Sequence, residues 1–148
     1  DGVDGLCGSC SAIMLTAFSI ICVKLGFPAI SIFAAIIAGS CVGFLIYNFH
    51  KAKVFMGDTG SLFLGGALAC IAIYIKMPLL LLVIAIIPII ETLSVIIQVL
   101  SFRFRGKRVF RMTPLHHHFE LTGWRENRVV GVFALITLIA SIIGILLV

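Results

Sequence analysis

Apolar residues fill five long stretches of the 148-residue chain, and polar residues collect in the segments between them. A helix needs about 20 residues to cross a bilayer, and each stretch is close to that length. The stretches cover approximately residues 5–24, 28–47, 60–76, 78–101 and 128–148. Backbone groups in lipid must pair within their own segment, and the alternation of a membrane barrel is absent. We therefore predict an all-α polytopic membrane protein, with five transmembrane helices in a single domain over residues 1–148.

The fourth stretch differs from the others in length and in polar content. Its roughly 24 residues, at about 1.5 Å each, exceed the hydrocarbon thickness, so the helix must tilt or bend. Pro88 lacks an N–H and its ring clashes with the preceding turn, which predicts a kink nearby. Glu91, Ser94 and Gln98 follow at spacings that place them on one helix face. This predicts a polar stripe descending toward the inner face. The alternative for Glu91 is a buried carboxylate that holds helices together.

Composition supports the membrane assignment. The chain is 61% hydrophobic and 11% charged, with a mean hydropathy of +1.25, whereas soluble domains are about a quarter charged. Because the chain begins with Asp1 and lacks a basic leading segment, we expect no signal peptide and a piece of a longer protein. The five cysteines are interpreted as small core residues, since the Cys7–Cys10 pair has no second pair to complete a zinc site.

Basic residues divide unequally between the connecting segments. With Asp1 inside, segments 48–59 and 102–127 also lie inside, and with their edges they carry nine of the eleven lysine and arginine residues. The outer turns carry only Lys24 and Lys76. This bias predicts that the polar face lies toward the cytoplasm. It also attributes the net charge of +5 to loops near anionic head groups rather than to nucleic-acid binding.

The segment Phe55–Ser61 places one carboxylate, two glycines and two hydroxyls between two apolar stretches. A charge at a membrane boundary, on backbone that a ligand can approach closely, is a candidate for chemistry. The alternative is an ordinary helix start, with Asp58 or Thr59 as the N-cap.

The inner segment 102–127 is basic and contains three consecutive histidines. Its basic residues alternate with apolar ones, a pattern that suits an amphipathic element at the head groups but could also attract a polyanionic substrate. His116, His117 and His118 cannot all ligate one metal from a regular helix, because adjacent residues point about 100° apart. We therefore expect a loop after Pro114, with the histidines as donors to phosphate or as proton carriers.

The polar groups of the inner face form one constellation. They are Asp1, Asp4, Asn48, Asp58, Gln98 and the three histidines. Aspartates without a cysteine in reach favour a hard cation such as Mg²⁺, which takes oxygen ligands and keeps several waters. Such an ion typically binds substrate phosphates too. Phosphoryl transfer at the membrane face is therefore the expected reaction class.

Two motifs carry a resemblance to a known family. The segments Phe55–Leu62 (Phe-Met-Gly-Asp-Thr-Gly-Ser-Leu) and Pro114–Glu120 (Pro-Leu-His-His-His-Phe-Glu) resemble the phospho-N-acetylmuramoyl-pentapeptide transferases, the MraY family. Asp1–Leu6 resembles the end of that family's Asn-Leu-Thr-Asp-Gly-x-Asp-Gly motif. The histidine motif is the specific one, because related polyprenyl-phosphate sugar-phosphate transferases have a different histidine pattern.

The resemblance implies a ten-helix enzyme of the bacterial plasma membrane, of which this chain is the last five spans. The implied reaction moves phospho-MurNAc-pentapeptide from its uridine nucleotide to undecaprenyl phosphate, giving lipid I and UMP. Asp58 is the implied Mg²⁺ ligand, and the implied catalytic residues are Asp58, His116 and His117. The implied substrate-binding residues are Asp1, Asp4, Asn48, Phe55, Gln98 and His118, with Phe55 suited to stacking on uracil.

Some features depart from the family. Lys51 stands where proline is usual, and Val130–Ala134 replaces the usual Arg-Phe-Trp. The family's adjacent Asp-Asp pair is not in this chain, so we expect the isolated chain to be inactive.

Two other functions stay open. One is a GlcNAc-1-phosphate transferase acting on a polyprenyl phosphate, and the other is a transporter or channel subunit with Glu91 and the kink at Pro88 in its pathway. The expected partners are a nucleotide sugar, a polyprenyl phosphate lipid and the membrane, without nucleic acid. A homodimer is left open.

Overall fold

The computed structural model describes residues 2–148, and within that range the secondary structure is entirely helical. Asp1, a predicted substrate-binding residue, lies outside the described residues. The helices are α1 (Leu6–Lys24), α2 (Pro28–Asn48), α3 (Gly57–Tyr74), α4 (Pro78–Ile84), α5 (Ile86–Arg105), α6 (Leu115–Leu121) and α7 (Glu126–Leu146). Five of them, all except α4 and α6, are long and apolar enough to cross a membrane. The predicted fold class is confirmed.

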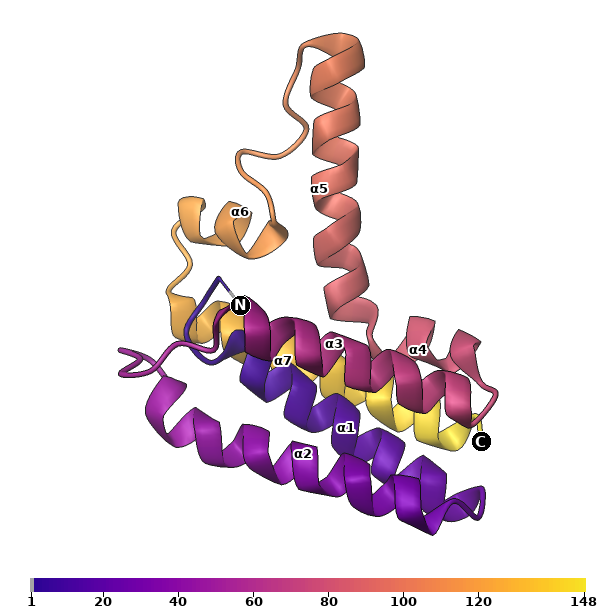
Figure 1. Ribbon diagram of the computed structural model, residues 1–148. Helices are drawn as coiled ribbons and strands as arrows, with labels where there is room; N and C mark the ends of the chain where they lie inside the picture. The colour runs from indigo at the N-terminus through magenta and orange to yellow at the C-terminus, as the bar shows by residue number, and fades with distance from the viewer. Residues whose placement is uncertain (1) are drawn as a thin grey trace.

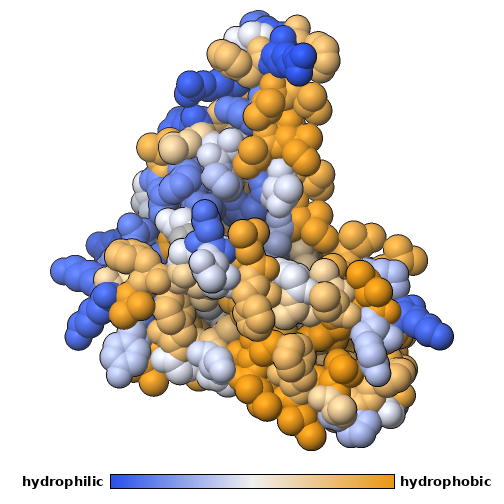
Figure 2. All heavy atoms as spheres, viewed as in Figure 1, coloured by the Kyte–Doolittle hydropathy of each residue, from blue (hydrophilic) through white to orange (hydrophobic). Residues whose placement is uncertain are grey.

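Helix α1 is the centre of a bundle formed with α2, α3 and α7 (Figure 1). It packs mainly against α2 and α7, and its side chains Leu15, Phe18 and Ile21 are fully buried. The surrounding helices expose many apolar side chains, and Figure 2 shows hydrophobic residues over much of the visible surface. Apolar side chains on the outside are what a helix needs where its solvent is lipid.

Glycines allow close helix approach at positions that the sequence did not single out. A Cβ at Gly144 of α7 would stand 2.6 Å from Cγ1 of Ile84 in α4, so only a glycine lets these helices pack as they do. Gly65 and Gly66 of α3, by contrast, have no described atom within 4 Å of a Cβ built on them. The close contacts within residues 2–148 are therefore made elsewhere.

The fourth predicted span is broken into α4 and α5. Helix α4 ends at Ile84, Ala85 takes φ −94° and ψ 32°, and α5 begins at Ile86. Pro88 explains this position, because a proline ring clashes with the carbonyl four residues earlier, here that of Ile84. In the first turn of α5 the missing N–H costs nothing, since it would have no partner there. The predicted kink is confirmed as a full break, after which α5 leaves the bundle (Figure 1).

Helix α5 buries little of its own surface. Ile87 and Ser94 are its only buried residues within the described range. Its polar stripe of Glu91, Ser94 and Gln98 lies on one face, as predicted, and two of these side chains bond residues 109–116. Helix α6 and the basic segment before it, residues 107–113, therefore lie alongside α5, beside the polar end of the bundle (Figure 1).

Candidate active site

Segments that are distant in sequence meet at one end of the bundle. The start of α1, the end of α2, the start of α3, helix α6 and the start of α7 all lie on the left of Figure 1. In Figure 2, hydrophilic residues gather over this region and along the side of α5 that faces it. The polar chemistry that the sequence assigned to one face is thus collected in one place.

Asn48 ties three of these segments together. Its side chain is buried, its Oδ1 accepts a hydrogen bond from the Gly5 N–H at 3.0 Å, and its Nδ2 donates to the Val54 carbonyl at 2.9 Å. In the turn before α1, Asp4 accepts the Ala52 N–H at Oδ2, at 2.9 Å. These two predicted substrate-binding residues therefore hold the loop between α2 and α3 in place.

Phe55 and Asp58 extend from that loop and are both exposed. The Phe55 side chain is 74% exposed, which leaves a ring face free for stacking. Asp58 lies in the first turn of α3, and the N-cap is Met56. The alternative interpretation of Asp58 or Thr59 as the N-cap is therefore wrong. Gly57 takes φ 66°, which a glycine adopts without strain, and the helix begins there.

The Asp58 carboxylate suits a magnesium ion. A carboxylate in a first helical turn is favoured by the helix dipole, and within residues 2–148 no hydrogen bond occupies its oxygens. Mg²⁺ is commonly held by one or two carboxylates, with waters and substrate phosphates completing the octahedron. One free aspartate matches that requirement. A second candidate metal site lies elsewhere in the described residues. Its three possible ligands are Asp4, His50 and Glu126, whose ligand atoms lie within 4.8 Å of one another.

The three histidines lie in helix α6 rather than in the loop that we predicted. Pro114 precedes the helix with φ −62° and ψ 172°, and Leu115 is the first helical residue. A proline is favourable just before or at a helix start, so Pro114 begins a helix instead of sustaining a loop. The rings of His116 and His117 lie beside each other, with centroids 4.2 Å apart. Within the described residues, the three histidines do not form a group of metal-type ligands.

His116 is bound to the stripe on α5. Its Nδ1 lies 3.2 Å from Oε2 of Glu91, and its backbone N–H donates to Oε1 of the same carboxylate at 3.2 Å. The two side chains are 7% and 16% exposed. Glu91 thus joins α5 to α6, which supports the interpretation of a carboxylate that holds elements together.

The other two histidines have separate partners. The His117 Nδ1 lies 2.9 Å from Oε2 of Glu120, one turn further along α6. The His118 Nδ1 accepts the backbone N–H of Arg111 at 3.2 Å. His118 therefore anchors the basic segment, whereas His117 remains about one-third exposed.

Gln98 holds the same basic segment against α5. Its Oε1 accepts the N–H groups of Val109 and Phe110, each at 3.0 Å, and its Nε2 donates to the Phe110 carbonyl at 2.9 Å. The side chain that we predicted to bind substrate is thus largely occupied in shaping the loop. Its contribution to a site is to fix where the neighbouring arginines lie.

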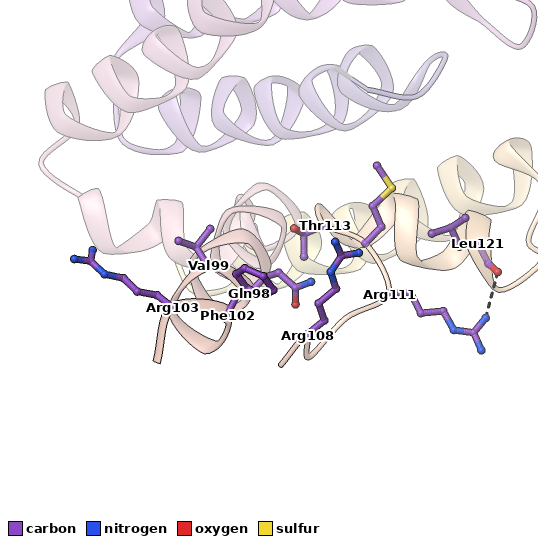
Figure 3. A pocket seen from close by; sticks show the side chains of 9 residues that line it. Gln98, Val99, Phe102, Arg103, Arg108, Arg111, Thr113 and Leu121 are labelled. Atoms are coloured by element: carbon purple, nitrogen blue, oxygen red, sulfur yellow. Dashed lines mark hydrogen bonds between the residues drawn. The ribbon is translucent and has the colours of Figure 1, made fainter. Parts of the chain in front are cut away.

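A hollow of about 780 Å³ lies between α5 and the basic segment. Figure 3 shows Arg108 between Arg103 and Arg111, which extend toward opposite sides. The Arg111 Nη1 donates to the Leu121 carbonyl at 3.4 Å. Apolar side chains, including Phe102, complete the wall. Cationic groups beside an apolar wall suit a head group or a phosphorylated substrate, so both interpretations of the basic segment remain open.

The turn before α1 connects the histidines with the rest of the site. A Cβ built on Gly2 would stand 2.7 Å from Nε2 of His116 and 3.7 Å from Nε2 of His117. Only a residue without a side chain lets the backbone lie this close to the rings. The site therefore has two sides, with Phe55 and Asp58 at the start of α3, and Gln98 and His118 beside α5.

Sequence reasoning missed several residues at this end. Glu120 could have been found, because it follows His117 at the three-residue spacing that pairs side chains on a helix. His50 and Glu126, whose Nδ1 and Oε2 atoms are 3.5 Å apart, come from segments with no local signal that they meet. Trp124 and Arg128, with the guanidinium 4.4 Å from the ring centroid, stabilise the start of α7.

Comparison with known proteins shows what the chain is similar to. The family model described as "Glycosyl transferase family 4" matches residues 1–76. A phospho-N-acetylmuramoyl-pentapeptide-transferase of Clostridium botulinum (strain Eklund 17B / Type B) is 55% identical over 144 residues, which cover 97% of this chain and 44% of that protein. The protein of the same name from Clostridium kluyveri (strain ATCC 8527 / DSM 555 / NBRC 12016 / NCIMB 10680 / K1) is 49% identical over 146 residues, 99% of this chain and 46% of its own length.

A third relative of that name, from Shouchella clausii (strain KSM-K16), is 54% identical over 145 residues, covering 98% of this chain and 45% of its own length. The chain therefore spans less than half the length of the curated relatives it matches. The resemblance that the motifs predicted is confirmed.

Proposed function

The chain belongs to glycosyl transferase family 4, and from this premise we propose that the intact protein is a magnesium-dependent phospho-sugar transferase of the membrane. It transfers phospho-MurNAc-pentapeptide from UDP-MurNAc-pentapeptide to undecaprenyl phosphate, and it gives lipid I and UMP. The observation that carries the proposal is the high identity to transferases of that name over nearly the whole chain. The exposed Asp58 at the polar end of the bundle agrees with it.

The residues of this chain take distinct roles in the proposed reaction. Asp58 holds the magnesium ion, which when bound neutralises charge on the substrate phosphates. Phe55 offers an exposed ring on which uracil stacks. Asp4 and Asn48 hold the loop that carries Phe55, so their proposed part in nucleotide binding is to fix that ring in place.

The histidines and arginines act on the other side of the site. His117 is partly exposed and suited to donate to phosphate or carry a proton. Gln98 and His118 fix the basic segment, so that Arg108 and Arg111 lie where they can attract an anionic substrate. The proposed face is cytoplasmic, because nearly all basic residues are on that side.

The two rival functions lack a supporting observation. A transport pathway through Glu91 requires a carboxylate that lines an open path, but this carboxylate is bound to His116 through both oxygens. A GlcNAc-1-phosphate transferase would be expected to resemble proteins of that name, whereas the relatives reported above carry the other name.

The proposal is tested by replacing Asp58 with asparagine in the intact protein. The amide keeps the size of the side chain but removes the charge that binds the cation, so UMP release is expected to fall by about 100-fold or more. The measurement is release of UMP from UDP-MurNAc-pentapeptide with purified enzyme, undecaprenyl phosphate and Mg²⁺.

The matched control is Arg105→Gln, which also removes one charge from an exposed side chain of the same face but lies outside the candidate metal ligands. It is expected to retain activity, and both variants should elute as folded protein. Wild-type turnover by Asp58→Asn would contradict the assignment of Asp58. Release of UMP by the 148-residue chain alone would contradict the expectation that the chain is inactive by itself.

A further inference from the structure

The contact between Glu91 and His116 involves both oxygens of one carboxylate. One oxygen accepts the backbone N–H of His116 and the other lies at hydrogen-bond distance from Nδ1 of the ring, each at 3.2 Å. Holding the backbone and the ring of one residue from a single carboxylate fixes the position and the orientation of the imidazole together. The remaining nitrogen, Nε2, therefore has a defined direction.

The chemistry of the pair determines which ring nitrogen carries the proton. An ionised carboxylate can only accept hydrogen bonds, so the nitrogen that faces it must be protonated. A neutral imidazole carries one proton, and with that proton on Nδ1 the other nitrogen is an acceptor. With Glu91 ionised and the imidazole neutral, the geometry of this pair defines the Nδ1–H tautomer of His116, with a lone pair on Nε2.

The Nε2 atom of His116 is buried and has no hydrogen-bond partner within residues 2–148. Buried polar atoms are nearly always paired, so one that is not requires an explanation. The atom lies directly against Gly2, which is exposed and carries no side chain to cover it. A ligand at the polar end of the bundle therefore reaches Nε2 only if this glycine is displaced.

We propose that Glu91 is a positioning residue that holds His116 as its Nδ1–H tautomer and reserves Nε2 as a hydrogen-bond acceptor for a hydroxyl or amide N–H of the sugar-nucleotide substrate. The identity of the ligand rests on the proposed function, whereas the tautomer does not. Glu91 touches no substrate itself, and its effect passes through the imidazole. No proton or bond changes hands in this role.

The tautomer is tested first, by ¹⁵N NMR of histidine-labelled intact protein in lipid. The His116 signals, assigned by their loss in His116→Ala, are expected to show a protonated Nδ1 and an unprotonated Nε2. In Glu91→Gln, an amide NH₂ replaces one of the two accepting oxygens, so the Nδ1–H population should fall measurably. Glu126→Gln, a carboxylate 3.5 Å from Nδ1 of His50, is the matched control and should leave the His116 signals unchanged.

The binding role is tested by kinetics of the same proteins. His116→Ala removes the proposed hydrogen bond between Nε2 and the substrate, so it is expected to raise the KM for the sugar nucleotide about 5- to 10-fold, with a smaller change in kcat. Glu91→Gln is expected to change both constants in the same direction. If Glu91 acts through His116, adding Glu91→Gln to His116→Ala produces no further rise. An additive effect would overturn the positioning role.

The two proposals fail in different ways. A protonated Nε2 in the wild-type protein overturns the inference even if the enzyme transfers phospho-sugar normally. Absence of transfer by the wild-type protein overturns the proposed function and the ligand class, while the NMR result still decides whether Glu91 sets the tautomer. If His116→Ala fails to fold, loss of the same signals in His116→Gln assigns them, so the wild-type spectrum still decides the inference.

Discussion

Lys51 takes a left-handed backbone conformation, with φ 62°. Side chains other than glycine are disfavoured there by about 1 kcal/mol, because Cβ approaches the following carbonyl oxygen. Proline, which the related family usually has at this position, fixes φ near −65° and cannot adopt it. The backbone of the loop that carries Phe55 therefore has a conformation at residue 51 that a loop with proline at this position cannot have.

A substitution of Lys51 tests this strain. Lys51→Gly should raise the free energy of unfolding by a few tenths to 1 kcal/mol, because relief of strain exceeds the greater flexibility of glycine in the unfolded chain. Lys51→Pro should lower it. The measurement is thermal unfolding in detergent.

The control for this prediction is Lys53→Gly, an exposed lysine of the same loop whose φ is not positive. There glycine adds flexibility without relieving strain, so the variant should be slightly destabilised. Equal effects at the two lysines would contradict the strain argument.

At the scale of elements, Gln98 determines how the basic segment is held. Three hydrogen bonds from one side chain replace the regular structure that residues 109–110 lack. In Gln98→Leu all three are lost, and the backbone N–H groups of exposed Val109 and half-buried Phe110 must bond water instead. Residues 107–113 should open more often, and trypsin should cut after Lys107 or Arg108 about 10-fold faster or more.

The comparison for Gln98→Leu is Thr92→Val on the same helix. The Thr92 hydroxyl bonds only the Pro88 carbonyl of its own helix, so its loss should leave the cleavage rate unchanged. Unchanged cleavage in Gln98→Leu would show that other contacts hold the segment.

The elements could be predicted wherever one residue type dictates the backbone. The lengths of the apolar stretches predicted the membrane-spanning helices. Pro88 predicted the break between α4 and α5, because its clash with the carbonyl of Ile84 is a local effect. Helix α6 could not be predicted in the same way. Its seven residues are too few to be helical alone, and contacts of His116 with Glu91 on α5 stabilise it.

At the scale of the whole molecule, the sequence located the candidate site but not the task of each residue in it. Charge placement predicted that the polar residues meet at one end, since basic residues are biased to one side of a membrane, and the described polar segments do meet there. Asn48 and Gln98 look alike in sequence as polar residues beside that end. Only the structure shows that both are occupied by backbone groups, because those partners come from segments whose approach depends on the tertiary fold.

The orientation of the whole molecule is the last feature that an experiment can decide. The bias of basic residues predicts that Lys107 lies in the cytoplasm, and that Lys76, in the short turn between α3 and α4, lies on the opposite side. Both lysines are exposed. Lys76→Cys should therefore react with a membrane-impermeant maleimide in intact spheroplasts, whereas Lys107→Cys should react only after the membrane is opened.

The unsubstituted protein is the control for this labelling. Cys10, Cys22 and Cys41 are buried and Cys7 is half-buried, whereas Cys70, which the sequence suggested was a core residue, is exposed within the span α3. A water-soluble reagent does not reach a thiol in lipid, so the background should be low. Labelling of Lys107→Cys in intact spheroplasts would place Asp58 and the histidines outside the cell. A cytoplasmic nucleotide sugar could then not reach them, and the proposed transfer reaction would lose its substrate.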